Sequence, residues 1–134
     1  MVTFGAVLKF ALKIEKQALE FYYNNINNEL FKSLVPQYEI RIKKLKRIRR
    51  ENTTEMILEP IHGFESSPFE IEGFIETQLE ERIENTGKEV EKIISVFYNE
   101  AAKKIVFLNE VSNLFEEIAF DHERNSKIIS KKLE

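Results

Sequence analysis

The 134-residue sequence contains no cysteine and no tryptophan, and it has only four glycines and three prolines. Without cysteine the chain can form neither a disulfide nor a zinc-thiolate site, and it has no thiol nucleophile. The same absence excludes an iron centre held by four thiolates. Because glycine and proline interrupt helices, their scarcity beside many Glu, Lys, Ile and Leu residues predicts an all-α fold with a few long helices.

Long hydrophobic runs and targeting signals are also missing. No stretch approaches the roughly 18 consecutive apolar residues of a membrane-spanning helix. Residues 1–5 show neither the basic region nor the cleavage pattern of a signal peptide. We therefore expect a cytoplasmic, single-domain protein with no membrane partner. The sequence has no glycine-rich phosphate loop, nucleophile elbow or His-Glu-x-x-His motif, so it predicts no catalytic residue.

The charged residues are strongly segregated along the chain. Seven of the ten residues in 41–50 are basic, whereas residues 55–91 contain eleven glutamates. One interpretation is two solvated helix faces that attract each other across a bundle or a dimer contact. The other is a site for nucleic acid or anionic lipid. The basic run lacks the Gly, Ser and aromatic residues of such sites, and Ile42, Leu45 and Ile48 recur in it at helical spacing, so we favour the first interpretation.

Hydrophobic periodicity predicts two helical hairpins. The first has helices at about 4–24 and 29–58, joined by an asparagine-rich turn, with Pro36 either kinking the second helix or dividing it near Val35. The second has a helix that continues from Val90 towards Phe107 and a last helix at about 110–131.

A connection lies between the two hairpins. It contains glycine, serine and proline at 62–69, where His62 is expected to be exposed, and a further helical stretch at about 71–83. Two hairpins with a long crossover form a known bundle topology.

The two hairpins share a sequence pattern. Ala11-x-x-x-Glu15-x-x-Ala18-x-x-Phe21-Tyr22 is echoed by Gly87-x-x-x-Glu91-x-x-Ile94-x-x-Phe97-Tyr98, and Leu30-Phe31-Lys32-Ser33-Leu34 by Leu114-Phe115-Glu116-Glu117-Ile118. In each copy a Glu precedes a Tyr by seven residues, which places both on one helix face with the apolar stripe. The sequence thus predicts two copies of one hairpin, at about 4–58 and 84–131, joined by a crossover at about 59–83.

These motifs carry a resemblance to a known family. The run from Ile14 to Tyr22 resembles the first helix of rubrerythrin-type ferritin-like domains, and the run from Glu91 to Tyr98 resembles their third. The resemblance implies a single ferritin-like four-helix bundle over residues 1–134 and, by analogy, a homodimer. In that family one Glu from each of helices one and three, with a Glu-x-x-His motif from each of helices two and four, holds two irons.

The family's ligands transfer to this chain only in part. Counted from Phe31 and Phe115, the six ligand positions hold Glu15, Glu91, Tyr38, Arg41, His122 and Asn125. Only the two glutamates are retained in kind. Glu39 and Glu123 lie one residue away from two lost positions, but one residue turns a helical side chain by about 100°, so we expect both to face solvent.

Two hypotheses follow for the altered centre. In the first, the Arg41 guanidinium replaces the charge of the metal, while Tyr38 and His122 donate hydrogen bonds to Glu15 and Glu91. Tyr22 and Tyr98 are then further donors or plain core aromatics. The centre would be a buried polar network that fixes the register of a non-catalytic structural or interaction module, with an unknown protein partner.

The second hypothesis keeps a metal. Glu15, Glu91 and His122, with or without Tyr38, would bind a single iron, manganese or zinc ion and support peroxide or oxygen chemistry. The fixed positive charge of Arg41 opposes a cation at that place, so we favour the first hypothesis and expect no cofactor.

Overall fold

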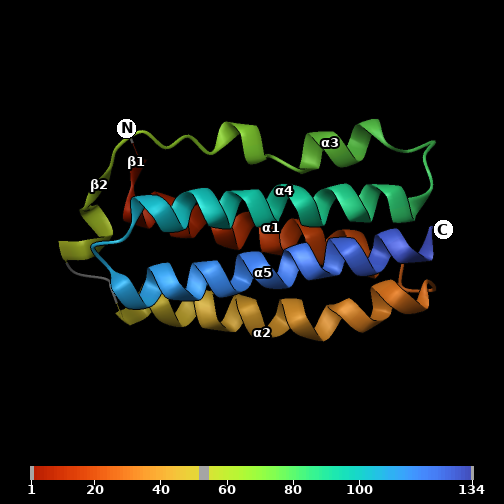
Figure 1. Cartoon of the computed structure of the whole chain (residues 1–134), viewed down its shortest axis with the longest axis horizontal. Helices are drawn as coiled ribbons and strands as arrows, with labels where there is room; N and C mark the ends of the chain where they lie inside the picture. The colour runs from red at the N-terminus through yellow and green to blue at the C-terminus, as the bar shows by residue number, and fades with distance from the viewer. Residues whose placement is uncertain (1, 52–54, 134) are drawn as a thin grey trace. The chain divides into compact units, whose positions relative to one another are not determined.

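The fold is described from a computed structural model that covers residues 2–51 and 55–133. Five α-helices account for most of these residues, and the two strands among them have two residues each (Figure 1). The all-α class expected from the composition is therefore confirmed. The chain divides into two compact units, residues 1–66 and 67–134, which we describe separately.

Unit 1 is a helical hairpin closed at one end by a short strand pair. Its elements in chain order are β1 (Val2–Thr3), α1 (Phe4–Asn24), α2 (Glu29–Glu51), the 3-10 helix η1 (Glu55–Leu58) and β2 (Pro60–Ile61). The Thr3 hydroxyl caps α1 by accepting a hydrogen bond from the Ala6 N–H at 3.1 Å. In the turn, the Asn28 side-chain oxygen accepts from the Phe31 N–H at 3.1 Å, so asparagine ends one helix and starts the next as predicted.

The second predicted helix is shorter than expected. It ends at Glu51, and η1 is a separate element, so the predicted end at Leu58 is wrong; residues 52–54 lie outside the described part of the chain. Contacts with the start of α1 account for the difference. The Phe4 N–H donates to the Glu59 carbonyl at 2.8 Å, and β1 pairs with β2 in antiparallel register. A Cβ on Gly5 would lie only 2.6 Å from Ile57 Cγ1.

Pro36 does not divide the helix. α2 runs without interruption through it, so of the two alternatives the division near Val35 is wrong, and the kink stays a prediction. Proline removes one backbone donor and disturbs a single turn. The apolar side chains on both sides of that turn, including Phe31, Leu34 and Leu45, are buried, and their packing keeps the two segments in one helix.

The segment after β2 has the predicted character of a connection. Gly63 has a positive φ of 69°, which glycine adopts without strain, and His62 is exposed as expected.

Unit 2 is a second helical hairpin preceded by two short helices. Its elements are η2 (Ser67–Phe69), α3 (Glu72–Thr77), α4 (Ile83–Lys104) and α5 (Asn109–Lys132), and α4 and α5 pack along their length (Figure 1). α3 is only six residues long, so the helical stretch predicted at 71–83 is interrupted after Thr77 by a turn at 78–80. α4 begins before the predicted pattern and stops at Lys104 rather than continuing towards Phe107.

The early end of α4 has a local cause. The Ser112 hydroxyl of α5 donates to the Ala102 carbonyl at 2.9 Å. In a longer helix that carbonyl would accept from the N–H of residue 106, so the hydroxyl satisfies one of the carbonyls left at the helix end. The predicted bounds of the last helix are confirmed within two residues.

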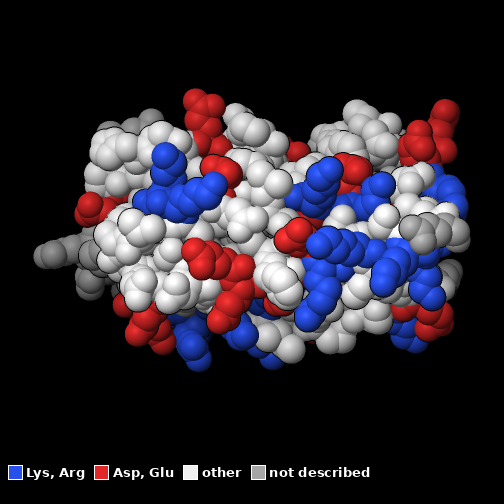
Figure 2. All heavy atoms as spheres, viewed as in Figure 1, with Lys and Arg blue, Asp and Glu red and all other residues white. Residues whose placement is uncertain are grey.

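Charge is distributed unevenly along α5. Its acidic side chains lie between Glu110 and Glu123 and its basic side chains between Arg124 and Lys132, which Figure 2 shows as red and blue areas along α5. This order complements the helix dipole. None of the helices in the described parts of the chain combines the length and the apolar character that crossing a bilayer requires.

Candidate functional site

The first buried polar group, which we call the Glu15 cluster, consists of Glu15, Gln37, Tyr38 and Arg41. Arg41 Nε of α2 donates to Glu15 Oε1 of α1 at 2.8 Å, and Arg41 Nη1 donates to Gln37 Oε1 at 3.3 Å. The guanidinium carbon lies 4.3 Å from the centroid of the Tyr38 ring, within the range of a cation–π contact. The cluster therefore holds one acid and one base in direct contact inside the hairpin.

Burial determines how much the Glu15–Arg41 ion pair contributes to stability. Glu15 is 0% exposed and Arg41 is 4% exposed, so neither charge is solvated by bulk water. Removing both charges from water costs about as much as their attraction returns, and such a pair is weak evidence for stability. Loss of either partner is different, because it leaves one buried charge without its counter-ion. The pair is thus better understood as a constraint on how α1 and α2 align than as a source of net stability.

The second group, the Glu91 cluster, consists of Glu91, Tyr98, His122 and Asn125. Glu91 Oε1 of α4 lies 2.8 Å from His122 Nδ1 and 2.9 Å from Asn125 Nδ2, both on α5. The Tyr98 ring stacks on the His122 ring with an interplanar angle of 6° and a centroid distance of 5.7 Å. Glu91, His122 and Asn125 are all wholly buried.

The donors of the Glu91 cluster follow from its geometry. Asn125 Nδ2 carries hydrogens and must donate, so Glu91 Oε1 is an acceptor. We therefore assign the Nδ1 proton to His122, which then donates to the same oxygen. One carboxylate oxygen of Glu91 thus receives two nitrogen donors in unit 2, whereas Glu15 Oε1 in unit 1 accepts from a permanent cation.

The two clusters sit in the same aromatic framework. In each unit a Tyr contacts the preceding Phe, the Phe of the following helix and the ring seven residues after that Phe. The pairs are Phe21–Tyr22, Tyr22–Phe31 and Tyr22–Tyr38 in unit 1, and Phe97–Tyr98, Tyr98–Phe115 and Tyr98–His122 in unit 2. Arg41 and Asn125 each lie ten residues after the framework Phe. The structure therefore places equivalent polar residues in equivalent surroundings.

Sequence reasoning located most of these residues. The predicted contacts of Arg41 with Glu15 and of His122 with Glu91 are confirmed, and Glu39 and Glu123 are exposed as expected. The hydrogen bond predicted from Tyr38 to a glutamate stays a prediction.

Sequence reasoning missed two residues of the clusters. It did not name Gln37, which accepts from Arg41, and it gave no role to Asn125, which donates to Glu91. Its equivalence to Arg41 in the sequence repeat was the available signal.

The side chains at the six ligand positions differ from those of the two-iron centre that the family resemblance implies. Such a centre needs carboxylate and imidazole ligands at all six positions. Here two of those positions hold an arginine and an asparagine, and their nitrogens are bonded to the oxygens that a metal would need. Within residues 2–51 and 55–133, no group of three or more His, Asp or Glu side chains is arranged to hold a metal ion. The residues present do not fit a two-iron centre.

Comparison of the chain with protein-family models, with curated proteins and with solved structures finds no match.

Proposed function

We propose that this chain is a ferritin-like helical bundle that has lost two-iron redox chemistry and acts as a non-catalytic structural or interaction module. One observation carries the proposal. In each unit the glutamate equivalent to a metal ligand is bonded instead to a nitrogen donor from the ligand position on the next helix, Arg41 in one unit and Asn125 in the other.

The chemistry of these bonds supports a structural role. A guanidinium supplies a permanent positive charge and a fixed set of donors, which compensates a buried carboxylate without any metal. The amide of Asn125 and the imidazole of His122 stabilise the Glu91 carboxylate by hydrogen bonding. Both arrangements satisfy the acid only when the helices of a hairpin are in one register. The clusters therefore act as alignment devices inside the hairpins and leave the surface to carry the function.

Metal analysis provides the first test. The protein is produced with added iron, manganese and zinc, beside a Glu15→Ala/Glu91→Ala double variant, and its bound metal is measured by mass spectrometry. We expect the unaltered chain to be well folded and to carry no stoichiometric metal. Near-stoichiometric metal that disappears in the variant would contradict the proposal.

Restoring the family's metal ligands provides a second test, because the expected result is a gain of iron binding. The four substitutions Tyr38→Glu, Arg41→His, His122→Glu and Asn125→His recreate a Glu-x-x-His motif on α2 and on α5. If the chain is a ferritin-like bundle, the restored variant should bind iron that the unaltered chain does not. A folded variant without iron would argue against the ferritin-like arrangement, whatever the natural role of the clusters.

A metal-binding redox protein is the second candidate. The observation in its favour is the buried contact of Glu91 with His122, because a carboxylate and an imidazole are both common ligands of iron, manganese and zinc. This candidate requires Arg41 to release Glu15. Metal bound by the unaltered chain and increased in an Arg41→His variant would favour it.

A further inference from the structure

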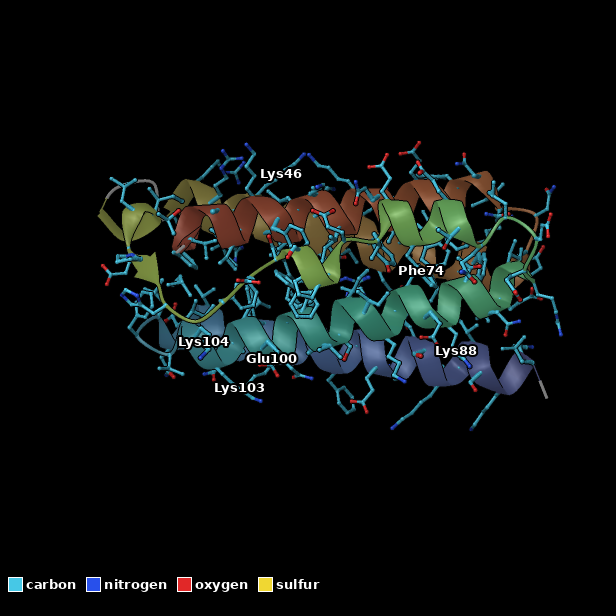
Figure 3. The ribbon with its side chains drawn as sticks, turned by 90° about the horizontal axis from the view of Figure 1, so that it is seen from above. Lys46, Phe74, Lys88, Glu100, Lys103 and Lys104 are labelled. Atoms are coloured by element: carbon cyan, nitrogen blue, oxygen red, sulfur yellow. The ribbon has the colours of Figure 1, made fainter. Side chains whose placement is uncertain are left out.

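The last two turns of α2 carry a concentrated group of exposed cations. Six of the eight residues in 43–50 are basic, and all six side chains are exposed. We call these residues the basic stripe: Lys43, Lys44, Lys46, Arg47, Arg49 and Arg50. Lys46 lies at the outer edge of unit 1 (Figure 3). The two residues between them, Leu45 and Ile48, are buried, so the core of the hairpin holds this part of α2 and leaves its cations in water.

The basic stripe has few acidic neighbours. All of its residues except Arg49, together with Ile40, line a hollow of about 450 Å³, and no acidic residue lines it. Within residues 2–51 and 55–133 the stripe forms one ion pair, between Arg47 and Glu51 at 3.6 Å, and both of these side chains are more than 60% exposed. An exposed pair of this kind contributes little to stability. The hollow thus contains none of the acidic side chains that an attraction between two helix faces requires.

The number of cations in the basic stripe matches the charge of a nucleic-acid duplex. Residues 43–50 span about 10 Å of helix axis at about 1.5 Å per residue. Double-stranded DNA carries one negative charge per about 1.7 Å of its axis, which gives about six phosphates in the same length. We propose that the basic stripe binds the phosphate backbone of double-stranded DNA. The whole chain has a net charge of -3, so the attraction depends on this local group of cations.

The residues around the hollow favour duplex DNA over other nucleic acids. Proteins that bind single strands stack the bases on aromatic side chains, and no aromatic residue lines the hollow. Recognition of an RNA duplex relies on contacts with its 2′-hydroxyl groups. No Ser, Thr, Asn or Gln lines the hollow, so it offers cations alone, which is what a phosphate backbone requires.

An anionic membrane surface fits the basic stripe less well. A helix that lies in a membrane interface inserts an apolar face between the lipids. In α2, all of whose residues the structure describes, the apolar residues Ile42, Leu45 and Ile48 are buried in the hairpin, and Ile40 is the one large hydrophobic residue that is exposed. The inference goes beyond the proposed function by naming a partner for the surface, and it does not depend on whether the buried clusters bind a metal.

Fluorescence anisotropy with a labelled DNA duplex of about 20 base pairs tests the proposal on the full chain. We expect a dissociation constant of roughly 1–100 μM at about 150 mM salt. If the five stripe cations other than Arg47 contact phosphates, the logarithm of the association constant falls with the logarithm of salt concentration with a slope of about -4.5. Raising the salt from about 50 to about 200 mM should then weaken binding several hundredfold.

A pair of matched variants makes the test specific. Lys43→Gln/Lys46→Gln removes two phosphate contacts, while glutamine keeps a helix propensity close to that of lysine. The slope should become shallower by about 2, and the dissociation constant at about 150 mM salt should rise at least tenfold. Lys9→Gln/Lys16→Gln makes the same change in net charge at exposed positions of α1 and should leave both quantities unchanged. Circular dichroism checks that each variant is folded.

Four results would overturn the proposal. The first is no binding of the duplex by the unaltered chain at about 50 mM salt, and the second is an equal loss of binding in the α1 control. The third is tighter binding of single-stranded DNA or of an RNA duplex of the same length. The fourth is stripe-dependent binding to vesicles with about 30% phosphatidylserine without binding to DNA, which would assign the stripe to a membrane surface.

Discussion

Replacing Arg41 with methionine isolates the role of the buried ion pair. The change keeps most of the aliphatic bulk of the side chain but removes the guanidinium that lies 2.8 Å from Glu15. Both residues are almost fully buried, so the carboxylate would remain in the hairpin without its counter-ion. Breaking a buried pair in this way costs about 3–5 kcal/mol, out of the roughly 5–15 kcal/mol that stabilise a typical domain. We expect a loss of that size in the free energy of unfolding at about pH 7.

The pH dependence of the loss has a defined sign. In the variant, the folded state favours the protonated form of Glu15, so the folded chain binds more protons than the unfolded chain. Stability then falls as pH rises, since its slope with pH follows the protons bound by the unfolded state minus those bound by the folded state. The variant should therefore regain part of its lost stability as pH falls towards about 5, relative to the unaltered chain.

Urea denaturation followed by circular dichroism at several pH values measures both effects. Arg47→Met is the matched control, because Arg47 forms an exposed ion pair with Glu51 on the same helix at 3.6 Å. That pair should contribute no more than about 0.5 kcal/mol. Changing both partners, Arg41→Met with Glu15→Leu, should recover most of the stability. A single variant that loses less than about 1 kcal/mol, with no dependence on pH, would refute the account of the Glu15 cluster.

Three further predictions test other parts of the structure by the same denaturation measurement. Asn125→Leu removes one of the donors to Glu91 in a buried site and should cost about 1–3 kcal/mol, and a neutral effect would show that the bond is dispensable. Gly5→Ala places a Cβ within contact distance of η1 and should destabilise by about 1–3 kcal/mol, whereas Gly73→Ala, where the added Cβ meets nothing, should be neutral or stabilising by up to about 1 kcal/mol. Thr3→Ala removes the cap of α1 and should cost about 1 kcal/mol.

The sequence predicted the helices and the facing of their side chains well, because helical periodicity is a local property. Counting ten residues from Phe31 and from Phe115 placed Arg41 and Asn125 inside the hairpins. Glu39 and Glu123, eight residues after the same phenylalanines, were placed outside. Over ten residues, the helical period of 3.6 residues per turn predicts accurately which face of the helix a side chain occupies.

The misses have a different origin. The pairing of β1 with β2 joins segments that are far apart in the sequence. A strand of two residues is too short to show the alternating pattern from which strands are predicted. That pairing, with the contact at Gly5, accounts for the end of α2. The role of Asn125 was missed because an amide has no charge to signal a partner for Glu91.

The two clusters differ in how a single mutation affects them. Glu15 accepts from Arg41, and Glu91 accepts from both His122 and Asn125, in each case on the next helix of the same hairpin. Loss of Arg41 removes the cation beside Glu15, whereas loss of Asn125 leaves His122 as a donor to Glu91. The hydrogen-bonded cluster of unit 2 therefore has a redundancy that the ion pair of unit 1 lacks.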